Sequence, residues 1–461
     1  MSTRGDAASV RSCNSARANQ SRGTRPAALS LLTAIIVAMA TTSASAQGVY
    51  MPSVGPINQS IGGAAVAAPI DSAGALYWNP ATISGLQSSE VEFGLGLVLP
   101  STTVSSSVAP NSFGVGVPPI PLAGSTRSEP GVSPVPTIAL VHKVRDSYWT
   151  VGIGIFGVGG FSTNYPASLT NPILSPQPPN GFGLGRVSSR GEIFQIAPTI
   201  SYAITENWSV GIAPTITMAH VEADPGFLSP PNDANGNGFF TYGSGTGTRY
   251  IFGGGFQIGT YYITDYDWRV GVSYKSPQWL EPVRVNSQDE LGRPTFSKVH
   301  FDLPSIASLG VAYTGFERWV LPFDIRFFDY AATDGFRQRG YNPNGSVAGL
   351  GWKSVLSITQ GAQFEVTDNL TWRAGYTFNQ NPITGPQTIF NIPTSLIIQH
   401  WLSTGFTYRL TPQVAATVAY THGFENQMTG PFVLPAGPIP GTSITGRVSA
   451  DILNFGLSVN Y

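Results

Sequence analysis

From about residue 90 to the C-terminus, large apolar residues alternate with small or polar ones. The last nine residues show this best, because one face carries Leu453, Phe455, Leu457, Val459 and Tyr461 and the other carries Asn454, Gly456, Ser458 and Asn460. A period of two places successive side chains on opposite faces of a β-strand. The same alternation recurs from near residues 91, 149, 208, 268, 319 and 370. The pattern predicts an all-β protein.

The two faces of these segments differ in composition. One is apolar, and the other carries mainly Gly, Ser, Thr, Ala and Gln, whereas a soluble sandwich exposes long charged side chains. Small polar residues opposite apolar ones are typical of a water-filled lumen surrounded by lipid. Tryptophans stand near the start of several segments, as in interfacial aromatic girdles: Trp149, Trp208, Trp268, Trp319 and Trp372. We expect a transmembrane antiparallel β-barrel, with a soluble sandwich as the alternative.

The connections between the segments alternate in length. Short polar turns fall near residues 145–146, 205–207, 265–267, 315–317, 367–369 and 411–412. Longer stretches rich in Gly, Pro and Asn fall near residues 101–130, 162–190, 223–245, 282–297, 331–350, 380–392 and 425–444. Short periplasmic turns and long extracellular loops are typical of outer-membrane barrels. Counting across them predicts about fourteen strands.

The N-terminus has the features of an export signal. Five arginines and one acid precede an apolar stretch over residues 27–40, and Ala44-Ser45-Ala46 then matches the A-x-A form of a signal peptidase site. We predict a cleaved signal peptide over residues 1–46, with cleavage between Ala46 and Gln47. The single cysteine, Cys13, lies in the removed part, so the mature chain has no disulfide and no cysteine for a lipid anchor.

Composition narrows the remaining classes of protein. Charged residues make up 11% of the chain, against about 25% in typical soluble domains. After residue 46 the chain keeps 24−5=19 basic and 25−1=24 acidic residues, so it offers no basic surface to nucleic acid. Beyond the N-terminal segment, no apolar run approaches the roughly 20 residues that a spanning helix needs. We therefore exclude a nucleic-acid-binding protein and a helical membrane protein.

Residues 47–88 do not alternate and are rich in Ala and Gly. Such a segment directly before a barrel (residues 89–461) predicts an N-terminal plug, or hatch, in the lumen. A disordered periplasmic tail is the alternative reading.

Short stretches of this sequence resemble the FadL/TodX family of outer-membrane transporters for hydrophobic compounds. The hatch carries Asp71-Ser72-Ala73-Gly74-Ala75 and Asn79-Pro80-Ala81, followed by Leu86. Further similar stretches are residues 148–154, 197–202, 271–276 and 373–376. Thr82 departs from the glycine that the family usually has there. The resemblance implies a monomeric, fourteen-stranded barrel in the bacterial outer membrane, closed by a hatch with the motif Asn79, Pro80 and Ala81. It also implies that the barrel-insertion machinery reads the last strand.

Strand parity places several charged residues in the lumen: Asp324, Arg326, Lys353 and Arg373, with Arg269 and Lys275 on a neighbouring strand. A cation in a partly dry cavity would bind a fatty carboxylate by charge-assisted hydrogen bonds. Arg326, Lys353 and Arg373 are therefore candidate substrate-binding residues. Alternatively, Arg326 pairs with Asp324 or Asp71 and anchors the hatch.

Alternation fails at Gly157, Gly159 and Gly160, on the third expected strand. Glycines inside a strand mark bulges or bends. A break in the wall would let a lipophilic molecule leave into the bilayer and avoid about 0.8 kcal/mol of transfer free energy per CH₂. Members of the resembled family are thought to open sideways at a kink in the third strand. We predict a lateral opening at these glycines. The alternative is that strands of this glycine-rich chain simply tolerate glycine near the rim of the barrel.

Other motifs predict neither a cofactor nor a catalytic site. Residues 152–157 match G-x-G-x-x-G, but no helix start follows, as a dinucleotide site requires. Residues 233–238 match the first half of a calcium loop, yet Ser244 stands where the bidentate acid is needed, so calcium binding stays open. The histidines after residue 46 show no metal-ligand spacing, and no Ser, His and acid set is marked.

The sequence thus predicts passive uptake of hydrophobic compounds, with long-chain fatty acids as the first substrate class and aromatic hydrocarbons as the second. A water-soluble porin and a structural or receptor barrel are the other candidates. The expected partners are hydrophobic small molecules, outer-membrane lipid and the insertion machinery.

Overall fold

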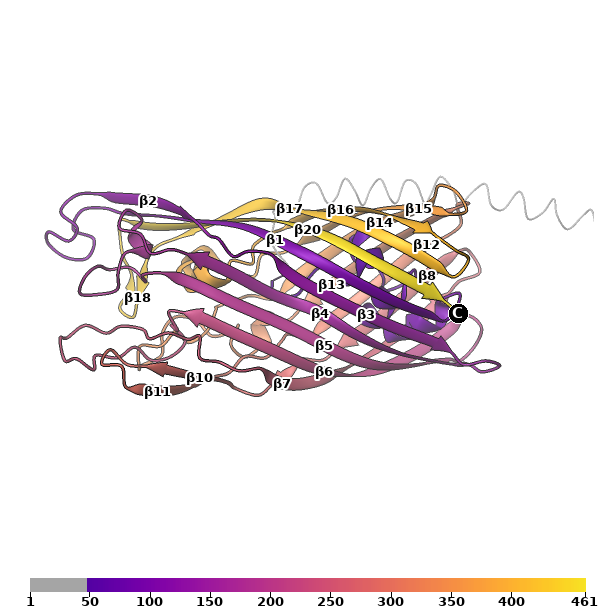
Figure 1. Ribbon diagram of the computed structural model, residues 1–461, viewed down its shortest axis with the longest axis horizontal. Helices are drawn as coiled ribbons and strands as arrows, with labels where there is room; N and C mark the ends of the chain where they lie inside the picture. Colours follow the sequence, from indigo (N-terminus) through magenta and orange to yellow (C-terminus); the bar gives the residue numbers. More distant parts are fainter. Residues whose placement is uncertain (1–47) are drawn as a thin grey trace, which may run out of the picture. The chain divides into compact units, whose positions relative to one another are not determined.

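A closed antiparallel β-barrel forms the body of the computed structural model, which describes residues 48–461 (Figure 1). The predicted signal peptide and its cleavage between Ala46 and Gln47 lie outside the described residues. The barrel strands are β1 (Glu90–Val108), β2 (Leu122–Arg127), β3 (Ser133–Lys143), β4 (Trp149–Tyr165), β5 (Val187–Ala203), β6 (Trp208–Asp224), β7 (Ile251–Ile263), β8 (Trp268–Lys275), β12 (Ile306–Tyr313), β13 (Trp319–Phe328), β14 (Val355–Glu365), β15 (Leu370–Asn379), β16 (His400–Arg409), β17 (Val414–Gly430) and β20 (Thr442–Asn460).

The remaining elements lie at one end of the barrel or in its lumen. The short strands are β9 (Trp279–Leu280), β10 (Val283–Gln288), β11 (Pro294–Val299), β18 (Val433–Leu434) and β19 (Gly437–Pro438). The helices are α2 (Pro56–Ser60), α3 (Ser72–Trp78), η1 (Pro80–Gly85), η2 (Pro172–Leu174), η3 (Tyr330–Ala332), η4 (Gly385–Gln387) and η5 (Ile389–Thr394). No helix within residues 48–461 has both the length and the apolar character that crossing a membrane requires.

Closure comes from the pairing of the first and last strands. β1 pairs with β20 over its whole length, from Glu90 opposite Asn460 to Val108 opposite Thr442. On its other side β1 pairs with β3 and then β2, which together fill one position in the wall. The wall therefore has fourteen strand positions, and the predicted fourteen-stranded barrel is confirmed.

The two faces of the strands lie as the alternation predicts. Phe93, Phe455 and Leu457 point outward and are about half exposed, at 46–50%, as suits side chains in contact with lipid. Asn454 and Ser458 point inward and are buried. The predicted plug fills the lumen beside Asn454, because the Gln59 side chain of the hatch accepts a hydrogen bond from the Asn454 amide. Small inward side chains leave room for the hatch.

Strands extend beyond the predicted boundaries at the end with the long loops. Residues 101–130 were expected to form a loop, but β1 continues to Val108 and β2 occupies Leu122–Arg127. Alternation is present there between inward Val104 and Val108 and outward Ser105 and Ser107. The sequence signal is weak because Thr102 and Ser106 also point inward, so both faces carry small polar residues.

The described part of the hatch, residues 48–88, lies inside the barrel near the end that holds the C-terminus (Figure 1). Two of its helices, α3 and η1, begin at side chains that accept backbone hydrogen bonds. The Asp71 carboxylate accepts the N–H of Gly74 at 2.9 Å, and the Asn79 side-chain oxygen accepts the N–H of Ala81 at 3.1 Å. Pro80 opens η1, where its missing N–H costs nothing. The prediction of an N-terminal plug is confirmed.

Two wall glycines let the hatch approach the strands closely. A Cβ atom at Gly259 would lie 2.0 Å from the Asn79 side-chain oxygen, and one at Gly271 would lie 1.9 Å from the Val66 carbonyl oxygen. Any other residue would push the hatch away from β7 and β8.

We predict that removal of Tyr461 impairs assembly. Its N–H donates to the carbonyl of Ser89 at 3.0 Å, and its ring stacks on His142 at 6.0 Å, so it joins the chain end to the strand closure. The amount of heat-modifiable barrel in the outer membrane should fall in the truncated protein. An unchanged amount would contradict this role.

Candidate functional site

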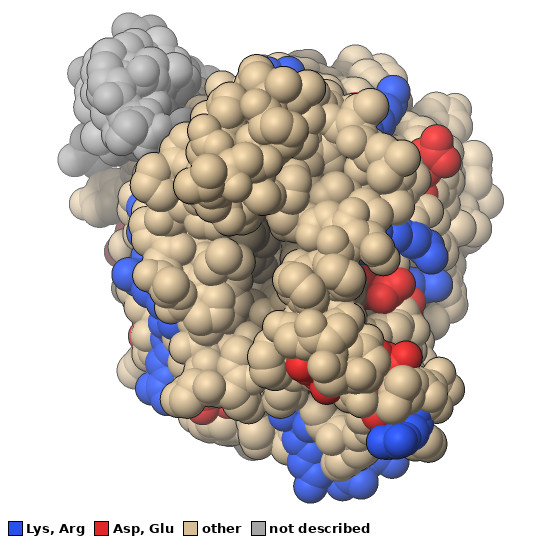
Figure 2. Space-filling view, turned by 90° about the vertical axis from the view of Figure 1, so that its left-hand side faces the viewer, with Lys and Arg blue, Asp and Glu red and all other residues tan. Residues whose placement is uncertain are grey.

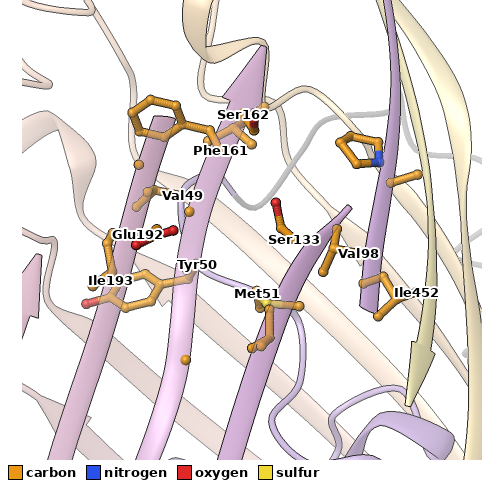
Figure 3. Close-up of a pocket in the computed structure, with 18 of the residues that line it drawn as sticks. Val49, Tyr50, Met51, Val98, Ser133, Phe161, Ser162, Glu192, Ile193 and Ile452 are labelled. Atoms are coloured by element: carbon orange, nitrogen blue, oxygen red, sulfur yellow. The ribbon is translucent and has the colours of Figure 1, made fainter. Parts of the chain in front are cut away.

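A cavity of about 170 Å³ lies between the start of the hatch and the wall. Figure 3 shows Val49, Tyr50 and Met51 close to β4 and Ser133, with Val98 and Ile452 across the cavity. Most of the lining is apolar and comes from β1, β3, β4, β5, β20 and the segment before β16. A space of this kind favours a hydrophobic ligand.

The wall beside this cavity is interrupted between β3 and β4. Their pairing ends with Thr137 opposite Phe156, and residues 133–136 pair only with β1. Pro134 and Pro136 have no N–H to donate toward a neighbouring strand. The register between β4 and β5 also shifts between Gly157 and Gly159, as a bulge does. The glycines singled out in the sequence therefore lie at a break in the hydrogen-bond ladder.

The first described residues of the hatch cover the free edge of β4. Met51 N–H donates to the Val158 carbonyl at 2.9 Å, and Gly160 N–H donates to the Val49 carbonyl at 3.3 Å. Tyr50 thereby stands opposite Gly159, where a Cβ atom would lie 2.3 Å from the Val49 oxygen. Residues 49–51, the edge segment, act as a short added strand. No sequence pattern predicts it, because three residues are too few to show alternation.

A second segment closes the cavity on the side of the long loops. The Pro393 carbonyl of η5 accepts hydrogen bonds from the hydroxyls of Ser189 and Thr163 on the wall. Asn391 accepts the indole N–H of Trp352 at 2.6 Å. Sequence reasoning treated residues 380–392 as an ordinary loop, since nothing in their composition shows that they turn inward.

Arg326 is fully buried and faces the hatch instead of the cavity. Its guanidinium pairs with Asp324 at 2.7 Å, donates to the Gly63 carbonyl and lies 3.5 Å from the ring centroid of Trp78. The Asp324 carboxylate also accepts the N–H groups of Ala65 and Val66 at 2.9 and 3.1 Å. These contacts fasten the hatch to β13.

The other two predicted cations also lie away from the cavity lining. Arg373 is buried and donates to Gln363 at 2.7 Å and to Thr407 at 2.6 Å. Lys353 is exposed, and β14 begins only at Val355. Strand parity therefore does not extend to Lys353.

Lys275 contacts an aromatic ring of the hatch. Strand parity placed Lys275 in the lumen but did not identify this partner. Its ammonium lies 3.7 Å from the ring centroid of Tyr77 and donates to Gln195 at 3.1 Å. With Arg326 over Trp78, two wall cations hold two neighbouring aromatic rings of α3. Which ring meets which cation depends on the rotation of the helix in the lumen, and the sequence carries no signal for that.

Three buried carboxylates surround the start of α3. Glu90 accepts the N–H of Ser72 at 2.8 Å, and Glu92 accepts that of Ala73 at 3.2 Å. Burial raises the pKa of Asp71 to about 7, although the Gly74 N–H and the charge of Arg373 oppose the rise. Within residues 48–461, no group of three or more His, Cys, Asp or Glu side chains is arranged to hold a metal ion.

The hatch motif joins the hatch to itself and to the wall. The Asn79 amide donates to the Val66 carbonyl at 2.8 Å and to the Thr260 carbonyl of β7 at 3.0 Å. Ala81 and Pro80 follow in η1 and are buried. The Asn79 amide can donate to both backbone carbonyls at once because it has two N–H groups.

Comparison with known proteins decides the family. The family model for outer membrane protein transport proteins (OMPP1/FadL/TodX) matches residues 35–461. The chain belongs to the OMPP1/FadL/TodX family. Membership places it in the bacterial outer membrane, in a family that transports hydrophobic compounds.

Solved structures of OMPP1/FadL/TodX proteins share its fold at low sequence identity. A FadL homologue from Pseudomonas aeruginosa has a TM-score of 0.68 at 14% identity, covering 90% of this chain and 99% of that one. The toluene transporters TodX from P. putida and TbuX from Ralstonia pickettii have TM-scores of 0.62 and 0.61 at 17% and 16% identity, each covering 89% and 99% of the two chains.

A curated sequence relative is the 47 kDa outer membrane protein of Pasteurella multocida (strain Pm70), 24% identical over 173 residues. That alignment spans 37% of each chain. This match supports an outer-membrane location for this FadL/TodX-family protein.

We predict that Asp324→Ala loosens the hatch of this FadL/TodX-family barrel. Removing one partner of a buried ion pair costs about 3–5 kcal/mol because the other charge stays unpaired. Ion conductance in planar bilayers should rise while the barrel stays folded. Asp368→Ala is the control, since Asp368 pairs with Arg318 at the surface. Equal conductance of the two variants would contradict a fastening role for Asp324.

We also predict that the docked hatch loses stability as pH rises from about 4 to about 7. In that window the buried Asp71 keeps a proton that it has lost when undocked, so raising the pH favours release. The charge of Glu90 on β1 adds to the rise in the pKa of Asp71, whereas the charge of Arg373 on β15 and a hydrogen bond with Glu92 lower it.

The measurement is conductance between about pH 5 and about pH 8, which should rise with pH. Asp71→Asn keeps the helix cap and should flatten this dependence. An unaltered pH profile in Asp71→Asn would rule out Asp71 as its source.

Proposed function

We propose that the protein takes up neutral hydrophobic compounds of about monoaromatic size and releases them sideways through the gap between β3 and β4. The observation that carries this proposal is the apolar cavity beside the interrupted wall. Passage needs no energy source, because the compound moves down its own concentration gradient.

The size of the cavity favours a compact ligand. At about 170 Å³ it is close to the cavity of about 150 Å³ that holds benzene in an engineered protein core. TodX and TbuX, which share this fold, are described as toluene transporters. A long acyl chain would need space beyond the cavity.

The distribution of charge favours a neutral ligand over a carboxylate. Arg326 contacts the hatch, Arg373 contacts neighbouring wall side chains, and Lys353 lies outside the strand. Arg190 is the cation among the cavity-lining residues, and it pairs with Glu192 at 2.5 Å. The sequence put long-chain fatty acids first. The positions of these side chains favour the second class, aromatic hydrocarbons.

A sideways exit follows from the chemistry of the ligand and the structure of the wall. A lipophilic molecule gains about 0.8 kcal/mol per CH₂ by staying out of water. The edge segment holds β4 through two backbone hydrogen bonds. Displacement of these three residues would connect the cavity to the bilayer without breaking a pair of long strands.

We predict that Val98→Trp slows uptake. Val98 lines the cavity from β1, so an indole there would occupy much of its volume. We expect a decrease of about tenfold, equivalent to about 1.4 kcal/mol in the barrier, in the entry of labelled toluene into cells that lack other uptake channels.

Phe93→Trp is the matched control, because Phe93 lies on the same strand and points to the lipid. Labelled oleate tests the substrate class in the same cells. Faster uptake of oleate than of toluene would overturn the preference for neutral compounds, and wild-type uptake by folded Val98→Trp would overturn the cavity route.

A further inference from the structure

The β10–β11 hairpin covers the rim of the barrel at the end with the long loops and has two unlike faces. Val283 and Val285 are buried on its inner face. The outer face carries two cross-strand pairs, Arg284 opposite Lys298 and Asn286 opposite Phe296. All four outer side chains are exposed.

The acids of the hairpin are occupied by local hydrogen bonds. Glu290 accepts the Thr241 hydroxyl at 2.7 Å and the Asn235 N–H at 3.4 Å from the neighbouring loop. Asp289 accepts the N–H groups of Leu291 and Arg293 at 2.9 and 2.8 Å within its own turn. The acids are thereby kept within the turn and its neighbouring loop, while the cations face outward.

Arg284 and Lys298 stand directly opposite each other, an arrangement that repels. Within residues 48–461 neither forms an ion pair with an acidic side chain. Figure 2 shows basic side chains gathered at the lower edge of the loop-bearing end, where the hairpin lies. An anion between the two side chains would turn this repulsion into attraction.

The hairpin sits just beyond the lipid-facing belt. Trp279 and Phe252 are 54% and 55% exposed on the outer surface below it, as interfacial aromatic residues are. Arg284 follows Trp279 by five residues along the chain. At about 3.3 Å per extended residue, Arg284 lies within about 17 Å of this interfacial tryptophan, on the side of the lipid headgroups.

We propose that the outer face of the β10–β11 hairpin binds the phosphate of a phosphorylated glycolipid headgroup in the outer leaflet. Arg284 and Lys298 donate charge-assisted hydrogen bonds to the phosphate oxygens. Phe296, exposed next to them, packs against the less polar part of the headgroup. A lipid headgroup fits better than a free phosphate because an apolar side chain and two cations share one face at membrane height.

The test is native mass spectrometry of the detergent-solubilised protein titrated with purified lipid A, dephosphorylated lipid A or inorganic phosphate. Arg284→Gln combined with Lys298→Gln should weaken lipid A binding about tenfold or more, since charge-assisted hydrogen bonds are lost. Arg145→Gln combined with Arg409→Gln removes the same charge from the opposite end and should bind as the wild type does.

Dephosphorylated lipid A should bind weakly to all three proteins. Equal lipid A affinity of the two double variants, or undiminished binding of the dephosphorylated lipid, would overturn the proposal. Inorganic phosphate bound as tightly as lipid A would show a free-anion site and overturn the lipid assignment.

Arg284→Glu separates binding from folding. It places opposite charges across the hairpin, so the hairpin should resist proteolysis at least as well as the wild type. The same change should abolish preferential binding of phosphorylated lipid A. Retained preference in a protease-resistant Arg284→Glu variant would overturn the proposal.

Discussion

A backbone in lipid has no water to pair with, so every N–H and C=O group of the wall needs a protein partner. The pairing of β1 with β20 meets this demand by closing the sheet. The ladder is interrupted where β3 separates from β4, and the edge segment supplies hydrogen bonds to β4 there. Because the covering strand is three residues long and belongs to the hatch, this interruption of the wall is tied directly to the hatch.

The hatch is held by polar contacts that are strong only while they stay dry. Asp324 and Arg326 form a buried pair whose desolvation is offset by backbone hydrogen bonds from Ala65 and Val66. The rings of Tyr77 and Trp78 cover Lys275 and Arg326. The carboxylates at the start of α3 add a proton-sensitive contact on the opposite side of the hatch. Strand pairing thus holds the wall, while these side-chain contacts hold the hatch.

Sequence reasoning succeeded where one physical pattern acts over many residues. Alternation over whole strands predicted the barrel and the outward face of Phe455 and Leu457, and the alternating lengths of the connections predicted the number of strands. Sequence reasoning failed where the alternation is short or weak. Examples are Lys353, which precedes the first residue of β14, and the Ser-rich end of β1. The glycines at 157–160 were found because they interrupt the alternation. The edge segment that covers them was missed, because its pairing with β4 joins residues more than a hundred positions apart.

By itself the sequence determined which side chains face lipid and which face the lumen, since the two-residue period of a strand is a local property. It also determined that a small-residue segment precedes the barrel. Only the tertiary structure decided what the lumen charges do: Arg326 and Lys275 face the hatch, and Arg373 donates to Gln363 and Thr407 of the neighbouring strands. Their partners depend on how the hatch is rotated inside the closed wall, and that rotation is set by long-range packing at Gly259 and Gly271, which no local pattern records.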